Sequence, residues 1–299
     1  MIAVLLIFVV WVIWLLCRKN GQSEQTELVS ETVWTSLDGE EHIVKNYELS
    51  DSAADAVAGM EDYEMEHLSM DGATFYYFHT LKETTAPVIL FLHGQGGEKE
   101  EYLGEFSEYA QMGYSCITLD IAGHGERASE EVLTALEASV QTSADMDLIF
   151  EYLQEKIDGI ILYGISQGGS IAYHYAAYGS YTPDLLVVAS TSPDFVDNYD
   201  EAIIVNGKAK EGEENQDSED FIEKNNPIAA WEQIAQSAVF SGNTIGDTVV
   251  SVTGSQELEA LFLENGVSDA TFLYYSGTSH DLPEVFFIRV AELLEGFYR

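Results

Sequence analysis

Short apolar runs alternate with longer amphipathic stretches along most of this chain. Six runs of strand length are largely apolar, at residues 87–92, 114–119, 159–163, 185–190, 248–252 and 271–275. Helical patterns lie between and after them, near residues 99–112, 129–156, 167–177, 257–265 and 283–297. Apolar strands that are separated by helices are typical of a parallel sheet covered on both faces. The pattern therefore predicts an α/β fold with a mostly parallel, doubly wound sheet.

The segments before the first of these runs have a different pattern. Two strand-like stretches within residues 63–80 meet at Asp71-Gly72, a dipeptide suited to a tight hairpin turn. Residues 18–60 are polar, or small and acidic, and they lack a sustained apolar period. We interpret them as a polar tether and an approach to the domain. The folded domain is expected over residues 61–299.

An acidic stretch interrupts the alternation of strands and helices. Residues 211–223 contain seven acids and no cation. A run of like charges usually forms a solvated surface, and this one lies between two segments assigned to the sheet. We therefore predict that residues 195–246 form a lid-like insertion.

The amino terminus is apolar without interruption. Residues 2–16 contain no polar or charged side chain, so residues 1–17 are interpreted as a single-pass membrane anchor. A cleaved signal-like segment and lipidation of Cys17 are alternatives, although no basic residue precedes the run. Arg18 and Lys19 follow it, which favours a cytoplasmic domain, with an extracellular domain as the alternative.

The charge balance restricts the possible partners. The 299 residues include 52 Asp and Glu but 12 Lys and Arg, for a formal net charge of −40. Such a field repels phosphate backbones, so no nucleic-acid partner is expected, and neutral or cationic small molecules are favoured. The two cysteines, Cys17 and Cys116, exclude a disulfide framework and a four-thiolate zinc site. We expect no metal and no cofactor.

A glycine-flanked serine is the strongest chemical signal. The apolar run at residues 159–163 leads into Gly164-Ile165-Ser166-Gln167-Gly168, and a helical pattern follows. Glycines two positions before and after a serine allow a sharp strand-to-helix turn that exposes its hydroxyl. Ser166 is therefore a candidate nucleophile, and the alternative is a glycine-rich turn without a catalytic role.

Two further motifs follow predicted strands. His93-Gly94-Gln95-Gly96-Gly97 closes the run at residues 87–92, and its glycines permit a close backbone approach with an exposed N–H group. His93 itself is interpreted as structural. His280 follows the last apolar run and precedes the final helix, where it could accept the proton of a serine.

In this order, the motifs resemble those of the α/β-hydrolase superfamily. HGQGGEKE and LDIAGHGER, followed by GISQG and a late histidine, are similar to its esterase, dienelactone-hydrolase and prolyl-oligopeptidase-like branches. The resemblance implies that Ser166 is the nucleophile and His280 the base. It also implies an oxyanion hole made by the main-chain N–H groups of Gln95 and Gln167. His124 matches a structural loop residue.

The resemblance also implies an acid that completes a catalytic triad with Ser166 and His280, and here the sequence departs from the family pattern. Where the family has an aspartate after a strand, the segment after residues 248–252 places Glu257. Asp194, after the strand at residues 185–190, is the alternative. The resemblance implies a serine hydrolase that cleaves a carboxylic ester, or a peptidase or thioesterase variant of the same mechanism. A catalytically silent binding protein with this fold is the other hypothesis, and neither acyl length nor oligomeric state is predicted.

Overall fold

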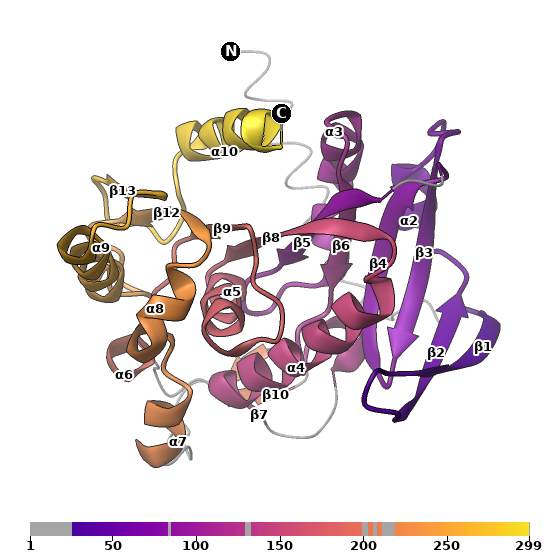
Figure 1. Cartoon of the computed structure of the whole chain (residues 1–299), viewed down its shortest axis with the longest axis horizontal. Helices are drawn as coiled ribbons and strands as arrows, with labels where there is room; N and C mark the ends of the chain where they lie inside the picture. Colours follow the sequence, from indigo (N-terminus) through magenta and orange to yellow (C-terminus); the bar gives the residue numbers. More distant parts are fainter. Residues whose placement is uncertain are drawn as a thin grey trace.

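A ten-stranded sheet crosses the whole molecule in the computed structural model (Figure 1). The structure describes residues 26–82, 85–128, 133–198, 203–205, 208–210 and 219–298. The strand order is β1-β2-β3-β4-β6-β5-β8-β9-β12-β13. Its pairs are antiparallel from β1 to β6 and parallel from β6 to β13. The strands are β1 (Leu28–Thr35), β2 (Glu41–Tyr47), β3 (Tyr63–Met70), β4 (Ala73–Thr80), β5 (Ala86–Leu92), β6 (Ser115–Leu119), β8 (Ile157–Ile165), β9 (Leu185–Ala189), β12 (Ala238–Thr244) and β13 (Ala270–Tyr275).

Helices cover both faces of this sheet, as the apolar strands predict. The apolar side chains of one face pack against α4 (Ala135–Leu153), α5 (Gln167–Tyr178), α8 (Trp231–Ile234) and α9 (Thr253–Asn265). Those of the other face pack against α2 (Asp51–Ala56), η2 (Lys99–Glu105), α3 (Phe106–Gln111) and α10 (Glu284–Phe297). The predicted α/β fold with a mostly parallel sheet is confirmed.

Local sequence signals determine where individual elements begin and end. The longest of these helices, α4, starts at Thr134, whose hydroxyl accepts from the Glu137 N–H while the Glu137 carboxylate accepts from the Thr134 N–H. This reciprocal cap satisfies two N–H groups that a helix start leaves without partners. At the other end of the domain, α9 stops at Gly266, whose φ of 73° suits glycine.

The strand predicted at residues 248–252 is wrong, because that segment consists of bends and irregular backbone. The sheet instead contains β12, between β9 and β13. β12 was missed because Ser241, Asn243 and Thr244 are polar although they are buried. The predicted insertion at residues 195–246 must therefore end before Ala238, where the sheet resumes.

Smaller elements occupy the described parts of that insertion. They are α6 (Phe195–Asn198), β10 (Ile203–Val205), β11 (Lys208–Lys210), α7 (Glu219–Lys224), η4 (Pro227–Ala230) and α8. β10 lies between β11 and β7 (Leu133–Thr134) in a separate three-stranded sheet.

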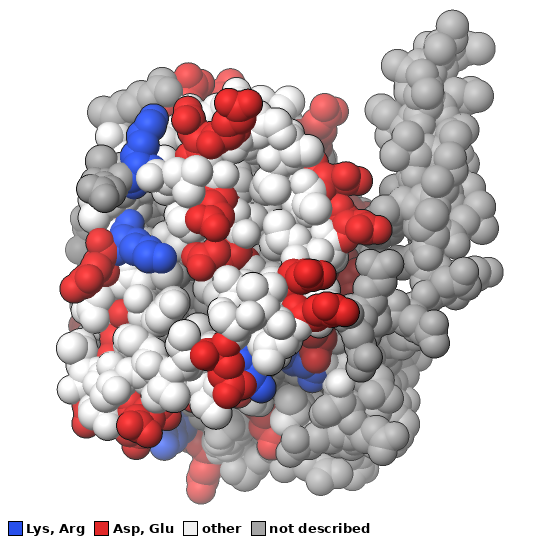
Figure 2. Space-filling view, turned by 90° about the vertical axis from the view of Figure 1, so that its right-hand side faces the viewer, with Lys and Arg blue, Asp and Glu red and all other residues white. Residues whose placement is uncertain are grey.

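The amino-terminal prediction also needs correction. Residues 26–60, assigned to a tether, contain β1, β2 and α2, and both strands belong to the large sheet. All residues of β1 except Trp34 are exposed, so no apolar alternation marks it as a strand. Figure 2 shows the face on the side of β1–β3, where acidic side chains are scattered among uncharged ones.

The predicted membrane anchor at residues 1–17 lies outside the described residues. Within the part of the chain that the structure describes, none of the helices has the length and apolarity needed to cross a bilayer.

A buried ionic network joins the amino-terminal strands to the parallel part of the sheet. Lys99, at the start of η2, is fully buried, and its Nζ lies 3.0 Å from both Asp120 Oδ2 and Glu126 Oε1. Glu126 belongs to η3 (Gly125–Arg127), and its Oε2 lies 3.1 Å from Nε2 of His67 on β3. Asp120 also accepts a hydrogen bond from Thr74 on β4. Because buried charges are costly without partners, these contacts hold β3, β4 and the loop after β6 together.

Replacement of the Glu126 carboxylate should change how the free energy of unfolding varies with pH. Burial alone would raise the pKa of Glu126, but hydrogen bonding from His67 and the charge of Lys99 outweigh it and lower that pKa to about 2. Because the folded-state pKa is lowered, the ionised carboxylate of Glu126 stabilises the folded protein. This stabilisation is fully present at pH values above the ordinary pKa near 4.5 and is lost as the pH falls toward 2. We expect Glu126→Gln to lower the free energy of unfolding by about 2 kcal/mol at pH 7. Denaturant unfolding should show the difference shrinking between pH 5 and pH 2 (about 3 pH units); a constant difference would contradict the ionic explanation.

The start of α5 packs directly on the end of β5. A β-carbon built on Gly168 would lie 2.1 Å from the main-chain oxygen of Leu92, a distance that no real contact has. Gly168→Ala should therefore force the helix away from the sheet and lower the free energy of unfolding by about 3 kcal/mol, which thermal or denaturant unfolding would measure.

Gly296→Ala is the matched control, because Gly296 is also helical and a β-carbon there meets nothing within 4 Å. This control should leave stability unchanged or raise it by up to about 1 kcal/mol. Equal effects of the two substitutions would show that the close approach at Gly168 is unimportant.

Candidate active site

Ser166 occupies a strained turn between β8 and α5. Its φ is 55° and its ψ is −119°, a backbone conformation that costs free energy for any residue with a β-carbon. Gly164 and Gly168 make the turn possible, because a β-carbon on Gly164 would lie 2.3 Å from the Gly168 main-chain oxygen. The main-chain N–H of Ser166 donates to the carbonyl of Ala189 at the end of β9. The serine therefore stands at the carboxyl edge of the sheet, where parallel strands place ligand sites.

His280 lies directly beside this serine. It belongs to the loop between β13 and α10, and its Nε2 lies 2.9 Å from Ser166 Oγ. The two residues predicted as nucleophile and base are 114 positions apart in the chain but are within hydrogen-bond distance.

The carboxylate that orients His280 belongs to Asp247, in the loop after β12. Asp247 Oδ2 lies 2.7 Å from His280 Nδ1, and only 2% of the Asp247 side chain is exposed. Its other oxygen, Oδ1, accepts from the main-chain N–H groups of Val249 and Val250, at 2.8 and 3.2 Å. Both oxygens are thus held, and Ser166, His280 and Asp247 form one hydrogen-bonded chain.

Neither acid predicted from the sequence occupies this position. Glu257 is exposed on α9, and no hydrogen bond between it and His280 is present in the described part of the chain. Asp194 Oδ1 accepts instead from Asn226 Nδ2 and from the main-chain N–H of Val196. The strand before Asp194 was predicted correctly as β9, whereas Glu257 was chosen because the strand before the acid was misplaced at residues 248–252. Asp247 would have been found by placing the end of that strand at Thr244.

The two residues predicted to form an oxyanion hole, Gln95 and Gln167, are both near Ser166. Gln167 is the first residue of α5, and the first N–H groups of a helix have no acceptor within it. Gln95 lies in the turn after β5 and lines the same cavity as Ser166. The loop passes close to the serine, because a β-carbon on Gly94 would lie 3.6 Å from Ser166 Cβ.

His93 helps to hold this loop in place. Its Nδ1 lies 2.8 Å from the Gly94 oxygen and its Nε2 accepts from the Ile121 N–H at 3.1 Å. Burial lowers the pKa of His93 to about 4, so the ring is neutral near pH 7, with a proton on Nδ1. His124 is also fully buried, and its Nδ1 contacts the Ala122 oxygen, 3.2 Å away.

An open cavity of about 470 Å³ exposes Ser166 and His280. Its lining includes the apolar Val249, Leu282 and Phe287 and two carboxylates, Glu101 and Asp281. No lysine or arginine is among the described residues that line it. A serine hydroxyl beside an imidazole is suited to acid–base and nucleophilic chemistry.

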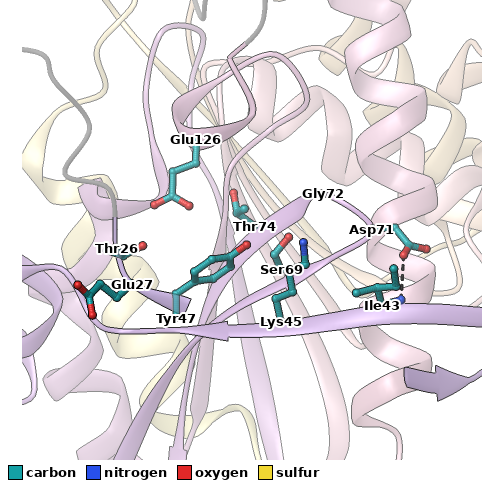
Figure 3. Close-up of a pocket in the computed structure, with 10 residues that line it drawn as sticks. All are labelled: Thr26, Glu27, Ile43, Lys45, Tyr47, Ser69, Asp71, Gly72, Thr74 and Glu126. Carbon is teal, nitrogen blue, oxygen red and sulfur yellow. Dashed lines mark hydrogen bonds between the residues drawn. The ribbon is translucent and has the colours of Figure 1, made fainter. Parts of the chain in front are cut away.

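A second, larger cavity lies on the face of the amino-terminal strands. It measures about 800 Å³ and is lined by parts of β2, β3 and β4 together with Glu126. Figure 3 shows the Glu126 carboxylate and the Tyr47 ring directed into it. Ser166, His280 and Asp247 do not line this cavity, so it is separate from the hydrogen-bonded chain.

Solved structures of known proteins resemble this one in fold. An acetyl xylan esterase from Paenibacillus matches with a TM-score of 0.57 and 16% identity, covering 84% of this chain and 88% of the esterase. An acylaminoacyl peptidase from Pyrococcus horikoshii matches with a TM-score of 0.60 and 13% identity, covering 93% of this chain and 51% of the peptidase. At these identities the likeness concerns the fold alone.

Sequence similarity to curated proteins is more limited. A multifunctional-autoprocessing repeats-in-toxin protein of Vibrio vulnificus is 28% identical over 167 residues, which are 54% of this chain and 3% of that protein. The chain therefore spans a very small part of this relative. Residues 89–283, by contrast, match the alpha/beta hydrolase family over most of the sheet and the whole hydrogen-bonded chain. The protein belongs to the alpha/beta hydrolase family.

Proposed function

We propose that this protein is a serine hydrolase that cleaves carboxylic esters through an acyl-enzyme. Ser166 acts as nucleophile, His280 as general base and acid, and Asp247 as the carboxylate that orients the imidazole. The hydrogen-bonded chain from Ser166 Oγ to His280 and on to Asp247 Oδ2 is the observation that carries the proposal. Its order and its distances are those that a serine nucleophile needs.

Acylation begins when Ser166 Oγ attacks the ester carbonyl carbon. His280 Nε2 takes the serine proton, while Asp247 accepts the hydrogen bond from Nδ1–H and stabilises the imidazolium. The carbonyl oxygen becomes an oxyanion, for which the N–H groups of Gln95 and Gln167 are the donors. One such donor typically lowers the barrier by about 3–4 kcal/mol.

Collapse of this intermediate breaks the bond to the leaving oxygen, which receives the proton from His280 Nε2 and departs as the alcohol. Water then attacks the acyl carbon, and His280 takes its proton as it took that of Ser166. The second intermediate collapses by breaking the bond to Ser166 Oγ, which regains its proton from His280. One ester and one water thus yield one acid and one alcohol.

The charges around the cavity favour neutral or cationic substrates. Two carboxylates, Glu101 and Asp281, line it, and the chain carries a formal net charge of −40. An anionic ester would be repelled on approach. Thioesters and peptides are variants of the same mechanism, since each presents a carbonyl carbon to Ser166.

Removal of the serine hydroxyl should abolish the reaction. We expect the full chain to hydrolyse neutral nitrophenyl esters and to be labelled by a fluorophosphonate, because Ser166 is activated by His280. Ser166→Ala should lose the label and reduce kcat by about 10⁴-fold or more. A nitrophenyl ester with a carboxylate on its acyl chain should react more slowly than its neutral counterpart.

Two outcomes of these assays would contradict the proposal. Labelling of Ser166→Ala as strong as that of the parent protein would exclude Ser166 as the nucleophile. A parent protein that neither reacts with the fluorophosphonate nor hydrolyses any ester would favour a silent binding protein with this fold.

The identity of the acid has its own test. Asp247→Asn preserves shape but places an amide against His280, which disfavours the tautomer with a proton on Nδ1. We expect kcat to fall about 10³–10⁴-fold while the thermal unfolding midpoint shows that the protein remains folded. Glu257→Gln, on the exposed face of α9, should leave kcat within about twofold of the parent. The reverse result would restore Glu257 as the acid.

A further inference from the structure

Ser190 adopts an unusual backbone conformation beside the candidate nucleophile. Among the described residues, the only non-glycine residues with positive φ are Asp71, Ser166 and Ser190. Asp71 is in a hairpin turn and Ser166 in the turn before α5, so both have evident reasons for this conformation. Ser190 directly follows β9, has a φ of 51° and is 2% exposed. Strain of this kind persists where surrounding contacts require it.

The contacts of Ser190 connect the loop of His280 to the strands beside Ser166. Its Oγ donates to the main-chain oxygen of His280 at 2.5 Å, and its main-chain N–H donates to the Gly242 oxygen of β12. The residue before it, Ala189, accepts the hydrogen bond from the Ser166 N–H. Ser190 also lines the cavity that exposes Ser166 and His280.

The loop that carries His280 needs such a contact. Residues 276–279 and 281 are exposed, so little side-chain packing holds the loop in position, although the Gly246 N–H donates to the Gly277 oxygen. The side chain of His280 is held by Asp247, but its main chain is tied to the sheet through the hydroxyl of Ser190. A small rotation of the loop would move Nε2 out of hydrogen-bond distance from Ser166 Oγ.

We propose that Ser190 is a positioning residue, whose hydroxyl holds the main chain of His280 so that the imidazole faces Ser166. This inference rests on the proposed function, because the histidine must act on the serine. It also explains why a serine rather than a glycine occupies a position with positive φ. Glycine would adopt this backbone without strain but has no hydroxyl to donate to His280.

Ser190→Ala and Ser190→Gly separate the hydrogen bond from the backbone conformation. Both remove the hydroxyl, whereas only the glycine relieves the strain, so Ser190→Gly should be the more stable of the two. We expect both to lower kcat on a neutral nitrophenyl ester by about 10- to 100-fold. KM should stay within about twofold, since Ser190 is only 2% exposed and offers little surface to a substrate.

Ser139→Ala is the matched control. Ser139 is fully buried on α4, and its Oγ donates to the main-chain oxygen of Ala135 at 2.8 Å. Its replacement removes a buried hydroxyl-to-carbonyl hydrogen bond away from the site, so it should leave kcat unchanged whatever its effect on the thermal unfolding midpoint. If Ser190 had a purely structural role, kcat would follow stability across Ser190→Ala, Ser190→Gly and Ser139→Ala. Ser190→Gly, the more stable of the two Ser190 variants, would then also be the more active.

Proton NMR of the His280 Nδ1–H hydrogen bond to Asp247 gives a readout that does not depend on hydrolysis. The downfield resonance should be present in the parent protein and in Ser139→Ala, and should broaden or disappear in Ser190→Ala. Unchanged kcat in both Ser190 variants, or an unchanged resonance in Ser190→Ala, would overturn the inference. A parent protein with no esterase activity would refute the proposed function, and the resonance would then decide whether Ser190 positions His280.

Discussion

The close fit of α5 against the end of β5 is the constraint on which the site depends. Gly168 allows the helix to approach the main chain at Leu92 so closely that a β-carbon has no room. Because Ser166 is in the turn between β8 and α5, this fit requires its left-handed backbone and places it beside the loop of Gly94 and Gln95. The exposed hydroxyl and the nearby N–H groups are thus two results of one packing contact.

The carboxyl edge of the parallel sheet brings the rest of the site to this turn. The loops after β8, β12 and β13 carry Ser166, Asp247 and His280, and parallel strands end at the same edge. Asp247 is one of 52 acids and is distinguished from the others by its surroundings. Two N–H groups hold one of its oxygens and His280 holds the other, so the carboxylate has no freedom to turn away.

Buried ionic contacts connect the amino-terminal strands to the parallel part of the sheet. Through His67 and Glu126 they reach Lys99, which begins the helix after the glycine-rich loop. The same lysine is paired with Asp120 in the loop after β6. Buried charges tolerate the loss of a partner poorly, so this network ties the antiparallel strands to the segment that carries Gln95.

Local patterns were enough to predict the fold class and to single out Ser166 and His280: an apolar strand, a glycine turn and a loop before a helix. They did not reveal β12, since Asn243 is buried there through hydrogen bonds from the Thr191 N–H and to Ser255 rather than through apolar packing. That Asp247 lies against the His280 imidazole follows from how the strands are paired and from no local pattern. Hydropathy reports the burial of neighbouring residues, whereas the pairing of β9, β12 and β13 is a long-range property.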